Sequence, residues 1–152
     1  MRTRPSRVLP HDLREIPAGD TALAFEAMRA LRTHYTDEGE FVRRVDVEQR
    51  PQGYRIVAAF EGDRAVAVAG FRVLRTLFSG DVLYVDDLST HPDGRRRGHA
   101  GALLDWCAEE GRRLGCDEIH LDSAVIPERQ DAHRLYFNRR MRIASYHFVR
   151  PL

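Results

Sequence analysis

The amino-acid sequence predicts a single domain of the mixed α/β class, with one β-sheet covered by helices on both faces. Three observations support this prediction. Two apolar segments joined by a short polar turn form a hairpin pattern, and beyond them strands alternate with amphipathic helices. The third is the length of 152 residues, which suits one ordinary domain that buries roughly two-thirds of its unfolded surface. We expect this domain at residues 11–152, behind a loose basic end at residues 1–10.

The N-terminal third of the chain predicts a short strand followed by two helices. The strand is expected at residues 11–16. Asp20 or Thr21 can cap the first helix, whose apolar residues recur at three- and four-residue steps. These residues are Leu23, Ala24, Ala27, Met28 and Leu31. A second helix is expected from Thr36 and should end before Pro51, because a residue that precedes proline disfavours helical backbone.

The middle of the chain predicts a hairpin and then a central strand. Val, Ile, Phe and Ala dominate residues 54–60 and 65–74, and the polar residues 61–64 between them indicate the turn. A second turn at residues 79–81 leads into an apolar strand at residues 82–90. We expect this strand to be the centre of the sheet.

The C-terminal third predicts two more helices and two more strands. From Gly101 the apolar residues follow a helical stripe to Leu114, and Gly115 is placed to cap the end of that helix. Residues 118–123 predict a strand, and a helix is expected to begin near Asp131. Aromatic residues at 142–149 predict a last strand.

The strongest functional signal lies at residues 91–101, between the central strand and the following helix. A turn is followed by three consecutive arginines and then by the small residues Gly98, Ala100 and Gly101. The first turn of a helix leaves about four backbone N–H groups without partners, at the positive end of the helix dipole. Phosphate groups bind at such a position. We therefore predict an anion site here, the alternative being a solvated run of charge.

These residues resemble the signature of the GNAT superfamily of N-acetyltransferases. Arg95-Arg96-Arg97-Gly98-His99-Ala100 fits the family's pattern of Arg or Gln, two residues, Gly, one residue, then Gly or Ala. The segment from Ala132 to Tyr136 resembles the family's later helix, in which a Tyr faces the reacting thioester. The resemblance implies a central mixed, mostly antiparallel sheet of about six to seven strands, flanked by about four helices.

The resemblance also implies that acetyl-CoA is the co-substrate. Its pyrophosphate would lie at the start of the helix, and its pantetheine arm would run beside the central strand like an added strand. The residues implied at the helix are Arg95, Arg96, Arg97, Gly98, His99, Ala100 and Gly101, and those implied on the strand are Leu88, Ser89 and Thr90. No His, Cys and carboxylate cluster has metal-ligand spacing, so we expect no metal.

Two adjacent carboxylates are the candidate proton acceptors for the attacking amine. An alkyl amine with a pKa of about 10.4 is protonated at pH 7 and must lose a proton before it attacks. Asp86 and Asp87 interrupt an otherwise apolar strand, where an unpaired charge is costly. One of the two is expected to face the site, and a bulge would exchange the faces. Asp86 is our first choice, because it falls where some GNAT members carry an active-site Glu. The alternative is that both accept structural hydrogen bonds or bind a cationic acceptor.

The resemblance places Tyr136 to protonate the departing thiolate, the alternative being a core tyrosine on an amphipathic helix. The Gly-Phe pair that commonly follows this Tyr appears here as Arg140-Met141, so we expect a different turn geometry. Cys107 lies on the apolar stripe of its helix, and Cys116 has no base nearby in the sequence. Direct transfer in a ternary complex is therefore favoured over an acetyl-cysteine intermediate.

Composition narrows the class of partner. The net charge of +1 gives no electrostatic case for nucleic-acid binding, and all 24 Lys+Arg residues are arginine. No apolar run reaches about 18 residues, so we expect no membrane partner and a cytoplasmic location. The sequence thus predicts an N-acetyltransferase that acts on a small-molecule or peptide amine. Because many members of the family dimerise, a homodimer is a further prediction from the resemblance. The alternative is a non-catalytic acyl-CoA-binding regulatory module on the same fold.

Overall fold

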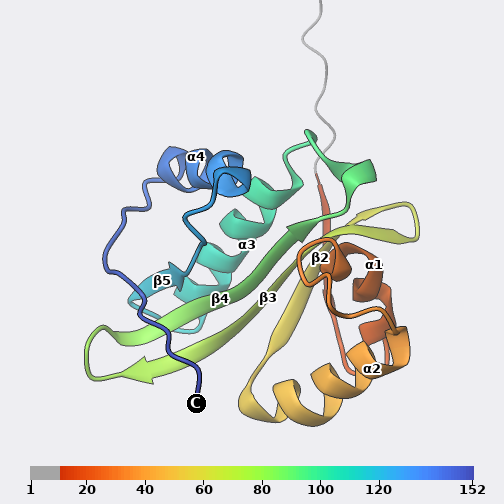
Figure 1. Ribbon diagram of the computed structural model, residues 1–152, viewed down its shortest axis with the longest axis horizontal. Coiled ribbons are helices and arrows are strands. Elements are labelled where there is room, and N and C mark those ends of the chain that lie inside the picture. Colours follow the sequence, from red (N-terminus) through yellow and green to blue (C-terminus); the bar gives the residue numbers. More distant parts are fainter. Residues whose placement is uncertain (1–10) are drawn as a thin grey trace, which may run out of the picture.

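The computed structural model describes residues 11–152 and contains a five-stranded sheet with helices on both faces (Figure 1). The strands follow one another across the sheet in the order β1-β2-β3-β4-β5. They are β1 Asp12–Ile16, β2 Arg55–Glu61, β3 Arg64–Thr76, β4 Gly80–Thr90 and β5 Glu118–Leu121. All neighbours are antiparallel except β4 and β5, which are parallel. The predicted fold class is confirmed, and the predicted loose end at residues 1–10 lies outside the described residues.

Four α-helices accompany the sheet in the described part of the chain. They are α1 Phe25–Arg29, α2 Glu38–Arg43, α3 His99–Arg113 and α4 Gln130–Asn138. The two N-terminal helices are shorter and less regular than the sequence suggests. A 3₁₀ turn, Thr21–Ala24, precedes α1, and α2 continues as a π-helical segment, Arg44–Gln49. A π-helix has a wider turn than an α-helix, so the side chains of this segment point in other directions than they would on a continuous α-helix.

The expected cap of the first helix is wrong, and a different cap starts the second. The Asp20 side chain makes no capping hydrogen bond, and the Thr21 hydroxyl donates to Asp46 at 2.6 Å. At α2 the Asp37 carboxylate accepts a hydrogen bond of 2.7 Å from the Glu40 N–H. Asp37 therefore satisfies one of the unpaired donors of that helix.

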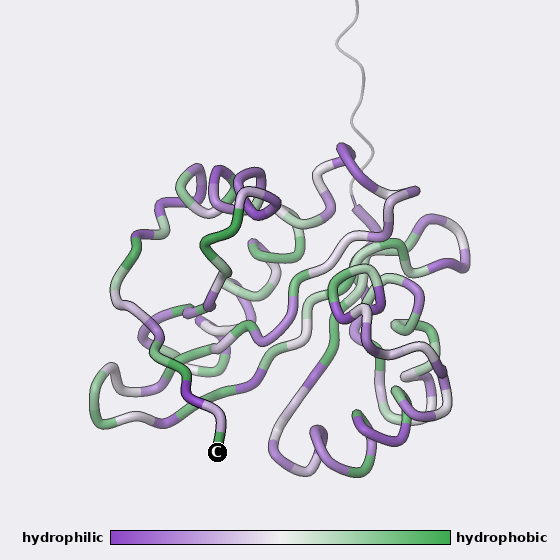
Figure 2. Tube along the Cα trace, viewed as in Figure 1, coloured by the Kyte–Doolittle hydropathy of each residue, from purple (hydrophilic) through white to green (hydrophobic). Residues whose placement is uncertain are grey.

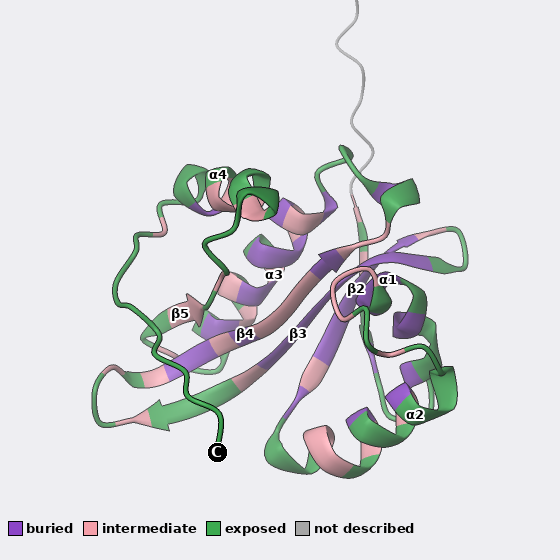
Figure 3. Ribbon diagram, in the orientation of Figure 1, coloured by how far each residue is buried: buried purple, intermediate pink, exposed green. Residues whose placement is uncertain are grey.

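The period of two in β2 divides the core into two layers. Ile56, Ala58 and Phe60 pack on the side of α1 and α2. Val57 and Ala59 pack on the side of α3 and α4. Successive strand residues point to opposite faces, so an apolar run such as this one requires cover on both sides. Figure 3 shows the result as buried residues concentrated along the central strands and the helix surfaces that meet them.

The predicted last strand at residues 142–149 is wrong. This segment has no regular structure, and Ile143, Tyr146 and Phe148 are 77%, 85% and 92% exposed. Figure 2 shows the chain between α4 and the C-terminus as an irregular trace in which hydrophobic and hydrophilic residues are mixed. Alternating apolar residues indicate that a segment suits a sheet surface. A strand also needs a neighbouring edge that supplies hydrogen bonds, and the described residues therefore form five strands rather than six to seven.

Helix α4 ends in a Schellman motif with an arginine at the position that favours glycine. The Met141 N–H donates to the Tyr136 carbonyl and the Arg140 N–H donates to the Phe137 carbonyl, both at 3.0 Å. Arg140 has φ 61°. The expectation of a different turn geometry is therefore wrong, because Arg140 adopts the left-handed conformation itself. Met141 packs against the core layer that contains Tyr136.

Replacing Arg140 with glycine is expected to stabilise the protein. The left-handed conformation costs an ordinary L-residue about 1–2 kcal/mol, and part of the gain is lost to the greater unfolded-state entropy of glycine. We expect Arg140→Gly to raise the free energy of unfolding by about 1 kcal/mol, measured by urea denaturation. Arg142→Gly is the control, because Arg142 is exposed and has no positive φ. Equal stability of the two variants would contradict strain at Arg140.

Candidate functional site

The site is built around a bulge in β4 at Asp86. On the β3 side Val85 pairs with Phe71 and Asp87 pairs with Gly70, so Asp86 is an extra residue without a partner. A bulge of this kind breaks the alternation of faces. As a result Asp86 and Asp87 both line the same cleft. The expectation that one of the two faces the site is wrong, and the bulge considered in the sequence analysis is the reason.

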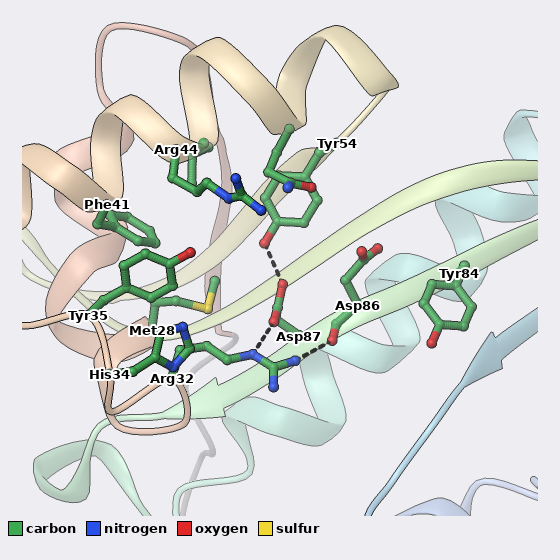
Figure 4. Close-up of a pocket in the computed structure, with 12 residues that line it drawn as sticks. Met28, Arg32, His34, Tyr35, Phe41, Arg44, Tyr54, Tyr84, Asp86 and Asp87 are labelled. Atoms are coloured by element: carbon green, nitrogen blue, oxygen red, sulfur yellow. Dashed lines mark hydrogen bonds and ion pairs between the residues drawn. The ribbon is translucent and has the colours of Figure 1, made fainter. Parts of the chain in front are cut away.

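The first cleft has a volume of about 410 Å³ and lies between β4 and the segments from α1 to the π-helix. We call it the acceptor cleft. Its apolar side is formed by Met28, Phe41 and Val45, which are themselves buried, together with Tyr35. Figure 4 shows Arg44 on the helical side of this cleft and Asp86 and Asp87 on β4.

Asp87 is held by two partners from distant parts of the chain. Arg32 Nε donates to its Oδ1 and the Tyr54 hydroxyl donates to its Oδ2, each at 2.7 Å. Burial raises the pKa of Tyr54 well above its usual value, and the Asp87 charge raises it further, so the phenol stays a neutral donor. Gly70 makes room for this ring, because a Cβ there would lie 1.8 Å from the Tyr54 hydroxyl.

Asp86 is paired with an arginine from β3. Arg72 Nε lies 3.0 and 3.1 Å from the two carboxylate oxygens, and its Nη2 donates to the Gln49 side chain at 2.6 Å. Burial raises the pKa of Asp86, and the Arg72 charge opposes that effect. The main-chain carbonyl of Asp86 accepts a further hydrogen bond from Arg32 at 3.0 Å. Asp86 therefore combines a partly desolvated carboxylate with a fixed position.

A second cleft, of about 210 Å³, adjoins the first and shares Arg32 and Asp86 with it. We call it the thioester cleft. It is lined by Leu88 from β4 and by Tyr136 from α4, among others. Tyr136 is 8% exposed, and its hydroxyl accepts a hydrogen bond of 3.2 Å from Arg129 Nη2. The clefts thus bring all three candidate catalytic residues, Asp86, Asp87 and Tyr136, to one region.

The sequence analysis missed the arginines that organise this region. Arg32, Arg72 and Arg129 contact Asp87, Asp86 and Tyr136 respectively. Arg32 is distant in the sequence from Asp87, Arg72 lies on the strand next to Asp86, and Arg129 precedes the helix that carries Tyr136. No local pattern separates these three from the other arginines. Only the pairing of residues in space identifies them.

The main chain of β4 beyond the bulge is open on one side. β5 pairs with β4 only from Val82 to Val85. From Asp86 to Thr90 that edge of β4 has no strand neighbour in the described chain, although β3 continues along the other edge. Leu88 faces the thioester cleft, whereas the Ser89 hydroxyl is buried and donates to the Ala27 carbonyl at 2.6 Å. Among the predicted strand residues Leu88, Ser89 and Thr90, Ser89 therefore has only main-chain groups available to a ligand.

The arginine and glycine segment forms a left-handed loop that leads into α3. Arg96 has φ 64° and Gly98 has φ 77°, and α3 begins at His99. The side chains of Arg97 and His99 both contact Glu61, and His99 Nδ1 also lies 2.9 Å from His11 Nδ1. Arg95 and Arg96 are exposed. The first turn of α3 therefore follows an exposed loop, and the start of a helix is a position at which anions bind.

Arg139 adds a further positive charge at this helix start. A Cβ built on Gly101 would lie 2.2 Å from Arg139 Nη2, so the guanidinium covers the first turn of α3. Arg139 also bonds Asp105 at 3.2 Å. The sequence gives no signal for this contact, because α4 and α3 are brought together only by the fold. Arg139 therefore approaches the predicted site residue Gly101 directly.

In residues 11–152 no group of three or more His, Cys, Asp or Glu side chains is arranged to hold a metal ion. No helix in that part of the chain has the length and apolarity needed to cross a membrane.

Cys107 is buried, and burial raises the pKa of its thiol to about 12. An unactivated thiol of this kind is a poor nucleophile.

Comparisons with known proteins agree on one family. The model of the acetyltransferase (GNAT) family matches residues 22–140. The uncharacterized N-acetyltransferase YhdJ of Bacillus subtilis is 28% identical over 132 residues, which cover 86% of this chain and 91% of that protein.

Solved structures share the fold. An acetyltransferase of Trypanosoma brucei superposes with a TM-score of 0.77 at 20% identity, covering 94% of this chain and 100% of that one. An aminoglycoside N-acetyltransferase, AAC(6')-Iy in complex with CoA, has a TM-score of 0.76 at 14% identity, covering 94% and 95%. Since the family model spans most of the sequence, including the loop before α3 and the whole of α4, the chain belongs to the acetyltransferase (GNAT) family.

Proposed function

We propose that the protein is an N-acetyltransferase that moves an acetyl group from acetyl-CoA to a primary amine by direct attack in a ternary complex. The observation that carries the proposal is the pair of adjoining clefts, which share Arg32 and Asp86 at the β4 bulge. The acceptor cleft suits the amine, and the thioester cleft, with Tyr136, suits the acyl donor. The two reactants would then meet beside Asp86.

The residues of the chain fit acetyl-CoA as a substrate. The first turn of α3, with Arg95, Arg96 and Arg139 around it, suits the pyrophosphate. The open edge of β4 from Asp86 to Thr90 suits the amide groups of the pantetheine arm, which pair with main chain as an added strand does. A family neighbour whose structure contains CoA supports the same choice of donor.

Asp86 is proposed to accept the proton of the bound ammonium, directly or through one water. The amine nitrogen then forms a bond to the thioester carbonyl carbon, and the carbon–sulfur bond breaks. Tyr136 gives its hydroxyl proton to the leaving thiolate, and the second proton that the nitrogen loses as the amide forms restores the phenol through solvent, while the first proton passes from Asp86 to solvent. Arg129, which donates to the Tyr136 oxygen, stabilises the negative charge that this oxygen acquires. Asp87 holds Arg32 and Tyr54 in place and is proposed as a positioning residue.

The direct test is calorimetric titration with acetyl-CoA and with desulfo-CoA, followed by release of free thiol in the presence of a panel of amines. Saturable binding together with amine-dependent thiol release supports the proposal. Binding without release from any amine would favour the alternative, a non-catalytic acyl-CoA-binding module. Absence of binding would contradict the assignment of the loop before α3.

Removing the Tyr136 hydroxyl is expected to slow turnover and leave donor binding intact. General acid catalysis typically contributes about 10²–10⁴ in rate, so we expect Tyr136→Phe to lower kcat at least tenfold on that scale. The Kd for acetyl-CoA should stay within about twofold, because the phenyl ring keeps its packing. Steady-state kinetics and calorimetry measure the two quantities. Tyr146→Phe is the control, since Tyr146 is 85% exposed. Full activity of Tyr136→Phe would contradict the role of Tyr136.

A change in the pH profile separates Asp86 as proton acceptor from Asp86 as a structural group. Arg72 lowers the pKa of Asp86, against the effect of burial. Arg72→Gln should therefore raise that pKa, and the acid limb of the kcat profile should move to higher pH, because the carboxylate must be ionised to act. Arg75→Gln is the control, since Arg75 lies exposed on the same strand. A lower kcat with an unmoved acid limb would point to a structural role alone.

A further inference from the structure

The carboxylates of the acceptor cleft are already matched by arginines. Asp87 pairs with Arg32 at 2.7 Å and Asp86 pairs with Arg72 at 2.9 Å. An additional positive charge on the acceptor would therefore find no unmatched carboxylate on β4. The acidic residues of α2, Glu38 and Glu40, are exposed and do not line this cleft.

The opposite wall carries an unbalanced positive charge at Arg44. Its acceptor in the described chain is Glu48, which also accepts a hydrogen bond of 2.8 Å from Arg43. Two guanidinium groups thus share one carboxylate. Arg44 lines the cleft with its side chain 47% exposed, whereas Arg43 does not line it and is 59% exposed.

The two carboxylates that line the cleft each have an arginine of their own, Arg32 for Asp87 and Arg72 for Asp86. Arg44, by contrast, shares Glu48 with Arg43, and Glu48 does not line the cleft. The next acidic residue on the π-helical segment, Asp46, is bound to Arg50 and Thr21. His34 also lines the cleft. The cleft therefore favours an anionic group on the acceptor.

The remaining lining is apolar and aromatic. Met28, Phe41 and Val45 form the buried side, and the rings of Tyr35 and Phe41 meet edge to face with centroids 5.9 Å apart. The volume of about 410 Å³ lies within the range of small-molecule sites. This surface suits an apolar side chain of modest size.

We propose that the acceptor is an amine that also carries a carboxylate and an apolar side chain, as free amino acids and short peptides do. Its carboxylate binds Arg44, its side chain packs on Phe41 and Tyr35, and its amine lies toward Asp86. Arg44 is then a specificity-determining residue. This inference rests on the proposed acetyl transfer and adds the chemical class of the acceptor.

The test compares acceptors that differ only in the carboxylate. Thiol release from acetyl-CoA is measured with phenylalanine, with phenylalanine amide and with 2-phenylethylamine, and with leucine against leucine amide. A charge-assisted pair with a guanidinium favours the carboxylate strongly, so we expect kcat/KM for each amino acid to exceed that of its amide at least about tenfold. The amide has the less basic amine, so a preference for the amino acid does not arise from a larger nucleophilic fraction. The dipeptide phenylalanyl-leucine is a separate arm that distinguishes a peptide acceptor from a free amino acid.

A matched pair of variants assigns the preference to Arg44. Arg44→Gln should reduce the ratio of kcat/KM for the amino acid to kcat/KM for its amide about tenfold. The change should arise mainly from a higher KM for the amino acid, while activity with the amide is retained. Arg75→Gln removes an exposed guanidinium that neither lines the cleft nor binds Glu48, and it should keep the wild-type ratio. Urea denaturation checks that both variants fold. Equal ratios in Arg44→Gln and the wild type would overturn the role of Arg44.

The outcomes also separate this inference from the proposed function. Turnover of the amides or of 2-phenylethylamine at or above the rate of the amino acids would overturn the acceptor class and leave the acetyltransferase assignment standing. Absence of thiol release with every amine would overturn both. Faster turnover of the dipeptide than of either amino acid would identify the peptide as the source of the carboxylate.

Discussion

The bulge at Asp86 is the constraint on which the site depends. One unpaired residue in β4 places two consecutive carboxylates in one cleft, which a regular strand would direct to opposite faces. It also lies where β5 stops pairing, so the main chain beyond it is open on that edge. The same irregularity thus shapes the cleft that we propose for the acceptor and the open strand edge beside it. Both clefts meet at this residue for that reason.

Arginine pairs keep this irregular region in one arrangement. Two charged groups in a half-buried position are costly unless each is matched. Arg32, which follows α1, binds both the Asp87 side chain and the Asp86 carbonyl, while Arg72 joins β3 to β4 and to Gln49. The planar guanidinium can bond several acceptors at once, as an ammonium ion cannot in the same geometry. A chain whose basic residues are all arginine therefore has many groups suited to such bridges.

The start of α3 and the end of α4 meet on the side of the sheet that we propose to bind acetyl-CoA. α3 begins at a left-handed loop, and Glu61 at the end of β2 binds Arg97 and His99 there. Arg139, which directly follows α4, covers the first turn of α3. The Schellman turn at Arg140 returns Met141 to the core and so fixes the end of the helix that carries Tyr136. Tyr136 is thereby held in a buried position next to Arg129. Strain at Arg140 is the cost of keeping this turn without a glycine.

The sequence by itself determined the features that depend on neighbours along the chain. Periodicity predicted β2, β3, β4, α3 and α4, and the glycine after α3 predicted its cap, because hydrophobic spacing and backbone freedom are local properties. The arginine and glycine loop and the Asp86-Asp87 pair were recognisable along the chain, whereas Tyr136 was a candidate only through the resemblance to the family. The tertiary structure alone decided which strand edges found partners, and residues 142–149 form no strand although their pattern suits one. It also decided the bulge, the arginine partners of all three candidates and the charge of the acceptor cleft, because these depend on contacts between residues up to 55 positions apart.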